Sequence, residues 1–170
     1  MEFRRDHDAL EISELDPFLA EILRQIPSSA LPEGSEAAEQ RLFSKPIAGP
    51  EHEICAEWKS YVEPELRRLF RSSTETVTED LKQLDRNEEP FVNCTLRIPI
   101  AHTDAWLNAL NQARLVIAAK YNFSDGELGD HYRSPIGSRR DLSLFQVNFY
   151  GFLQEFILHE INPCSDSPPN

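Results

Sequence analysis

Several features that mark other classes of protein are scarce or absent in this sequence. Only three of the 170 residues are cysteines, and an odd number at wide spacing fits neither a disulfide framework nor a zinc site. The longest apolar run is residues 115–119, far short of the roughly 20 residues that a membrane-spanning helix needs. The first residues contain no apolar stretch typical of a signal peptide. We therefore expect a cytoplasmic protein that does not enter a membrane.

Basic residues are also scarce. The chain has 17 Lys and Arg against 29 Asp and Glu, and its formal net charge is -12. Nucleic acids and anionic membranes attract proteins that neutralise phosphate groups, so this charge argues against both kinds of partner. Residues 1–90 carry 21 of the acidic and 11 of the basic residues, so most of the negative charge belongs to the first half.

Hydrophobic periodicity predicts a mainly α fold, a bundle of four to five helices with a small N-terminal β element. Residues 3–5 and 9–12 flank Asp6-His7-Asp8 and predict a short hairpin. Residues 94–98 alternate between apolar and polar side chains and predict a strand that Pro99 stops. An isolated hairpin is marginally stable, so we expect this strand near 93–98 to pair with it.

Proline punctuates the helical part of the chain. A first helix begins at Ser13 or Asp16 and ends at Pro27. Residues 27–50 predict a linker with a short helical turn near 37–43. Residues 51–87 predict a long amphipathic helix that either kinks at Pro64 or divides there into two, with a mixed-charge face turned to solvent.

Two more helices complete the prediction, over residues 103–122 and 141–161. The second is apolar almost all round, which predicts a central place in the bundle. The apolar side chains of this helix are either all buried within the chain or partly buried against a second copy in a homodimer. We expect a single helical domain over residues 1–161 and a disordered tail over 162–170.

Arg114 lies in the apolar stripe of the helix predicted over 103–122. A buried guanidinium without a partner costs several kcal/mol, and Glu155 on the last helix is the first candidate partner. Three interpretations stay open: a structural ion pair, an anion-binding arginine in a pocket, and an arginine that reaches solvent. Asn108 and Asn111, with Trp106 near the helix start, either line a polar pocket or only cap and solvate the helix.

A basic loop precedes the last helix and contains Arg133, Arg139 and Arg140. Ser138 or Asp141 can cap that helix, so backbone N–H groups and arginines would converge at its N-terminus. This arrangement suits a small anion. The alternative is a solvated loop whose arginines pair with the acidic first half.

No pattern of catalytic residues is evident. The sequence contains no nucleophile motif, phosphate-binding loop or calcium loop, and its five histidines form no ligand pair. We therefore expect a protein that is not an enzyme and that has no metal site and no cofactor.

Three segments carry a resemblance to a known family. Residues 38–46 (AEQRLFSKP), 105–115 (AWLNALNQARL) and 150–155 (YGFLQE) are similar to its linker, central-helix and C-terminal-helix motifs. The chain resembles a bacterial family known only as domain of unknown function number two thousand and seventeen, over roughly residues 3–160. It departs from the family pattern at Ser44 and Gln112, where the family has Pro and Asp.

The resemblance implies no activity. Members are often encoded beside the adaptor of the Clp protease, which implies a link to Clp proteolysis. The shared motifs single out a polar cluster made of Trp106, Asn108, Asn111, Arg114, Gln154 and Glu155.

These observations favour a non-catalytic, cytoplasmic protein-interaction or regulatory module whose protein partner is unknown. The alternative is a small-anion or metabolite-binding protein that uses Arg114, or Arg139 and Arg140. Convergence of Arg114, Asn111 and Glu155 in an open cleft would favour the alternative, whereas the same residues sealed inside would favour the interaction module.

Overall fold

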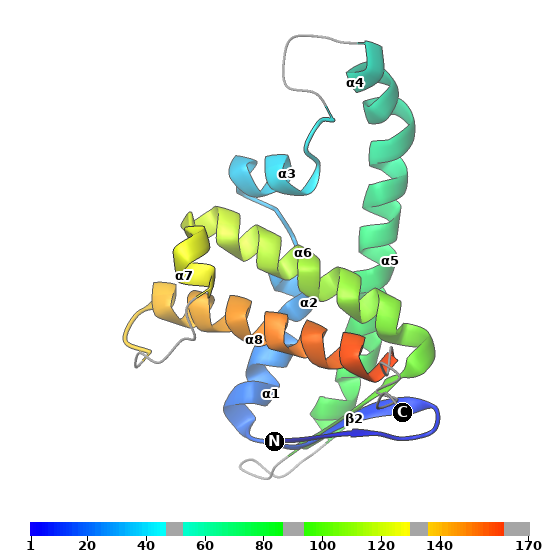
Figure 1. Cartoon of the computed structure of the whole chain (residues 1–170), viewed down its shortest axis with the longest axis vertical. Helices are drawn as coiled ribbons and strands as arrows, with labels where there is room; N and C mark the ends of the chain where they lie inside the picture. The colour runs from blue at the N-terminus through cyan, green and yellow to red at the C-terminus, as the bar shows by residue number, and fades with distance from the viewer. Residues whose placement is uncertain (47–52, 87–93, 130–135, 162–170) are drawn as a thin grey trace, which may run out of the picture.

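The computed structural model describes residues 1–46, 53–86, 94–129 and 136–161, which form several helices with a small sheet at one end (Figure 1). The mainly α prediction is confirmed. The α-helices are α1 (Pro17–Arg24), α2 (Ile26–Ser29), α3 (Glu36–Leu42), α4 (Glu53–Glu57), α5 (Glu63–Leu81), α6 (Thr103–Tyr121), α7 (Asp125–Gly129) and α8 (Arg139–Ile161). The tail predicted over 162–170 lies outside the described residues.

The sheet has three antiparallel strands in the order β1 (Glu2–Arg5), β2 (Ala9–Leu15) and β3 (Cys94–Pro99). Leu10 lies opposite Ile98 and Ile12 opposite Leu96, and all four side chains are buried in the core. A register shift follows Ile12 and places Glu14 in the left-handed region at φ 53°. The predicted hairpin and its third strand are confirmed.

Helix α1 is capped by Asp16, whose carboxylate accepts the N–H of Leu19 at 2.9 Å, so Asp16 rather than Ser13 is the cap. The helix ends at Arg24. Pro27 lies in the first turn of α2, where its missing N–H leaves no helical hydrogen bond unmade. The prediction that Pro27 ends the first helix is therefore wrong.

The long helix predicted over 51–87 is divided. Helix α4 passes into a π-helical segment (Trp58–Val62), which precedes α5, and a 3-10 turn (Lys82–Arg86) follows. Pro64 lies in the first turn of α5 and cannot donate a helical hydrogen bond, and just before it Glu63 N–H donates to the carbonyl of Trp58, five residues back. Helix α4 and the π-helical segment extend past the other helices (Figure 1).

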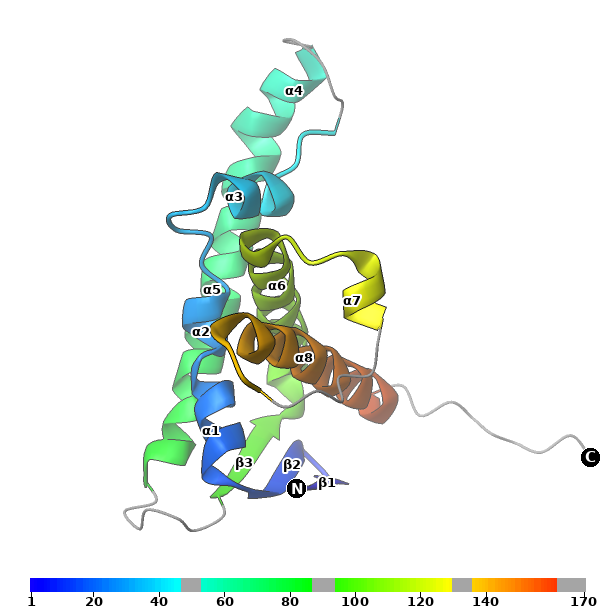
Figure 2. The same ribbon diagram turned by 90° about the vertical axis from the view of Figure 1, so that its left-hand side faces the viewer.

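The centre of the fold is α6 rather than the last helix. Helix α6 packs against α2, α3, α5 and α8, and Figure 2 shows it between α5 and α8. Helix α8 buries Tyr150, Leu153 and Ile157, but Phe152 and Leu158 are each 46% exposed. The central place predicted for the last helix is wrong, because its apolar residues are divided between a buried and an exposed side. No helix in the described part of the chain is both long and apolar enough to span a membrane.

Candidate functional site

Arg114 lies at the contact between α6 and α8. Its Nη1 donates to the Oε1 of Gln154 at 2.5 Å, and Gln154 Nε2 donates to the carbonyl of Leu107 at 3.1 Å. The guanidinium lies against Gly151, where an added Cβ would come within 3.2 Å of Arg114 Cζ. The Nε of Arg114 is buried and has no partner among the described residues. The cluster joins two helices and leaves little room for a ligand.

The partner predicted for Arg114 is wrong. Glu155 follows Gln154 by about 100° around α8 and is exposed, so its carboxylate does not reach the guanidinium. Asn111 is also exposed and Asn108 is half-buried. The structure therefore does not bring these residues together in a cleft, and it favours the structural interpretation of Arg114.

Trp106 belongs to a different cluster, between α5 and α6. Its Nε1 donates to the carboxylate of Asp80 at 2.9 Å, and His102 Nδ1 lies 3.0 Å from both oxygens of the same carboxylate. Asp80 is only 7% exposed. Periodicity alone did not single out Asp80, although it lies in the row of Val77, Leu81 and Leu84. Within the described residues, no three His, Cys, Asp or Glu side chains gather to hold a metal ion.

The described part of the basic loop is largely paired with protein groups. Arg140 Nη2 lies 2.7 Å from Glu127 Oε1, and its guanidinium lies over the ring of Phe123. At the start of α8, the carboxylate of Asp141 accepts the N–H of Gly137 and the hydroxyl of Ser138. This carboxylate occupies the place that an added anion would take. Arg139 is exposed, and Arg133 lies outside the described residues.

Glu127 should make the stability of this region depend on acid pH. The N–H of Ser124 and the guanidinium of Arg140 hold the pKa of Glu127 at about 2. Its pKa is lower in the folded than in the unfolded chain, so its stabilising contribution is present above about pH 4.5 and is lost as the pH falls towards 2. We expect the melting temperature of the wild type to fall more steeply than that of Glu127→Gln across this range. Melting temperatures of the two proteins that fall equally with pH would contradict this role of Glu127.

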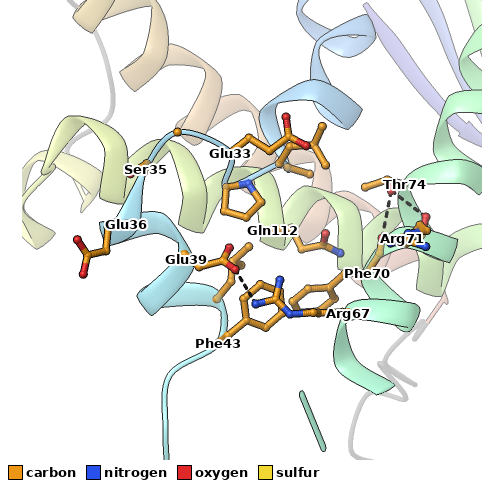
Figure 3. Close-up of a pocket in the computed structure, with 15 residues that line it drawn as sticks. Glu33, Ser35, Glu36, Glu39, Phe43, Arg67, Phe70, Arg71, Thr74 and Gln112 are labelled. Atoms are coloured by element: carbon orange, nitrogen blue, oxygen red, sulfur yellow. Dashed lines mark hydrogen bonds and ion pairs between the residues drawn. The ribbon is translucent and has the colours of Figure 1, made fainter. Parts of the chain in front are cut away.

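A cavity of about 650 Å³ lies between α3, α5 and the segment that joins α2 to α3 (Figure 3). Helix α5 contributes Arg67, Phe70, Arg71 and Thr74, whose spacing places them on one side of the helix. The mixed-charge face of the helix is largely exposed, as predicted, and the ion pair between Arg67 and Glu39 links it to α3. The cavity could not be read from either helix alone.

Gln112 of α6 lines the same cavity. It is 2% exposed, and its Nε2 is buried with no hydrogen-bond partner among the described residues. Figure 3 shows its side chain projecting from α6 towards those of α3 and α5. A buried amide N–H without an acceptor costs about 1–3 kcal/mol. Because this nitrogen is out of contact with solvent, an acceptor in the cavity would satisfy it only after the side chain turns towards the cavity surface.

The two arginines of the cavity differ in their surroundings. Arg67 Nη2 lies 2.5 Å from Glu39 and 2.8 Å from Glu63, and its guanidinium stacks on the ring of Phe43 at 3.8 Å. These contacts fasten α3 to α5. Arg71 is exposed, and its guanidinium has no ion pair within the described residues. Arg67 therefore shapes the wall, whereas Arg71 is available to a ligand.

Comparison with known families agrees with the motifs in the sequence. The family described as domain of unknown function DUF2017 matches residues 1–161. The chain belongs to this family. The match to DUF2017 spans the sheet, all the described helices and the cavity. No curated protein and no solved structure matches the chain significantly. The family description assigns no activity, and the implied link to Clp proteolysis stays a prediction.

Proposed function

We propose that this member of the DUF2017 family is a non-catalytic binding module that holds a segment of a partner polypeptide in the cavity between α3 and α5. The observation that carries the proposal is the buried, unpaired amide of Gln112 in a cavity of about 650 Å³. Binding sites commonly combine an apolar concave surface with a few polar groups that need a partner.

The walls of the cavity favour a polypeptide as the ligand. Glu33, Glu36 and Glu39 line it from the α3 side, Arg67 and Arg71 from α5, and Phe43 and Phe70 add apolar surface. A peptide segment offers N–H groups, carbonyl oxygens and apolar side chains together, so it can meet all three kinds of surface.

Apolar side chains are also exposed on α5 and on the π-helical segment before it. Tyr61 is 75% exposed, and Val62 and Leu69 are about half-exposed. Exposed apolar side chains that gather on one element are typical of protein-binding surfaces. The alternative of anion binding by Arg114 or Arg140 receives less support, because both guanidinium groups already contact protein side chains.

A tryptophan that fills the cavity should abolish peptide binding. We would select binders from a soluble pool of short random peptides on the wild type and measure each one by fluorescence anisotropy. Thr74→Trp places an indole in the cavity, and we expect it to weaken binding about tenfold or more. Thr78→Trp, one turn further along α5 and exposed, is the matched control and should bind as the wild type does.

Circular dichroism would establish that both variants remain folded. Selected peptides that bind Thr74→Trp as tightly as the wild type would place the binding surface elsewhere. A pool that yields no binder for the wild type would also count against the proposal.

A further inference from the structure

The unpaired groups of the cavity restrict the chemical class of the ligand further, on the basis of the function proposed above. Two of them are donors, the guanidinium of Arg71 and the Nε2 of Gln112, and the carboxylates of Glu33 and Glu36 are acceptors. Glu39 and Glu63 already neutralise Arg67, so an incoming anion gains most from Arg71. The ligand must therefore bring at least two acceptors, one of them negatively charged.

The opposite wall restricts what that anion can be. Glu33 and Glu36 line the cavity, and within the described residues no cation pairs with either of them. A phosphate group carries a charge of about -1.5 to -2 and would be repelled by these carboxylates. A carboxylate carries one charge, and the N–H groups of the chain attached to it can face the glutamates. The charge distribution thus favours a carboxylate on a peptide over a phosphate.

The apolar walls supply the last requirement. Leu42 and Phe43 of the α3 side face Phe70 of α5, so the ligand should carry an apolar side chain close to its carboxylate. The last residue of a polypeptide carries its carboxylate and its side chain on the same Cα, and the carbonyl of the preceding residue is one peptide unit away. An internal Asp or Glu has a carboxylate but no apolar side chain on the same Cα.

We propose that the cavity binds the free C-terminus of a partner polypeptide that ends in an apolar residue. The terminal carboxylate pairs with Arg71, and the apolar side chain lies against Phe43 and Phe70. Rotation about the side-chain torsions of Gln112 turns its Nε2 to the cavity surface, where it donates to the carbonyl of the preceding residue.

Two pools of short N-acetylated random peptides test this proposal, identical except that one ends in a carboxylate and the other in a carboxamide. We expect the wild type to enrich peptides from the carboxylate pool alone, with an apolar last residue. For each enriched sequence, the carboxamide should bind about tenfold or more weakly, because it loses a charge-assisted hydrogen bond.

Two variants test which side chains bind the C-terminus of the peptide. Arg71→Gln should lower the affinity for the carboxylate peptide to that of its carboxamide, whereas Arg68→Gln should leave it unchanged, since Arg68 pairs only with Glu65 within the described residues. Gln112→Leu keeps the size of the side chain but removes the donor, and it should weaken both peptides equally.

The possible outcomes separate the two proposals. Carboxamide and carboxylate peptides that bind equally, and that Thr74→Trp still excludes, would overturn the chain-end preference but leave the polypeptide-binding function in place. An Arg71→Gln variant that retains the preference for the carboxylate would also overturn it. No enrichment from either pool would overturn both proposals.

Discussion

Replacing Asp80 with alanine is expected to lower the free energy of unfolding by about 3 kcal/mol. The carboxylate is buried and accepts hydrogen bonds from Trp106 and His102, both at the start of α6. Without it, the indole N–H of the fully buried Trp106 has no acceptor, which alone costs about 1–3 kcal/mol. The rest of the loss comes from the bond to His102 and from the space that the shorter side chain leaves.

Chemical denaturation of Asp80→Ala and Glu79→Ala measures this effect. Glu79 is the adjacent residue on α5, but it is exposed and, within the described residues, pairs only with Lys82, so its replacement should change stability by less than about 0.5 kcal/mol. The cost of Asp80→Ala should also shrink when Trp106 is already phenylalanine, because the orphaned N–H is then gone. Equal effects of the two alanine variants would show that the Asp80 cluster does not stabilise the fold.

Local patterns were sufficient to predict most elements of this fold. The alternation at Leu10 and Ile12, and again at Leu96 and Ile98, reports a sheet with one buried face, and those side chains are buried. The capping role of Asp16 and the break at Pro64 also follow from short-range chemistry, because each depends on backbone groups within one turn. These features need no knowledge of the tertiary packing.

The position of each helix in the fold could not be predicted in the same way. The last helix carries apolar residues almost all round. Only the side with Tyr150 and Leu153 meets α6, and Phe152 remains exposed. Periodicity reports how apolar a helix is and leaves open which of several apolar faces another element covers. For the same reason, a homodimer remains one of two alternatives for the exposed apolar side of this helix.

The candidate site depended still more on packing between distant segments. Gln112 is a polar residue in an apolar row, and its role becomes visible only when α3 and α5 enclose it. Arg67 and Arg71 lie one turn apart on a mixed-charge face. One partner of Arg67, Glu63, is local, since it lies four residues earlier on the same helix. The other, Glu39, comes from another helix, and no local pattern predicts it.

Replacing Gln154 with leucine is expected to lower the free energy of unfolding by about 2 kcal/mol. Gln154 Oε1 accepts a hydrogen bond from the half-buried guanidinium of Arg114, whose Nε already lacks a partner among the described residues. Leucine would pack against α6 but would leave the guanidinium with no acceptor in its present place. Glu155→Leu changes the neighbouring, exposed residue and should alter stability by less than about 0.5 kcal/mol.

A double-mutant cycle distinguishes a structural Arg114 from a functional one. If the pair only joins α6 to α8, Arg114→Met in the Gln154→Leu background should restore most of the lost stability, because two apolar side chains replace two polar ones. Peptide binding should be unchanged in the same double variant, since Gln112 and Arg114 lie about 200° apart around α6. Loss of peptide binding at an unchanged melting temperature would instead place Arg114 in the binding site.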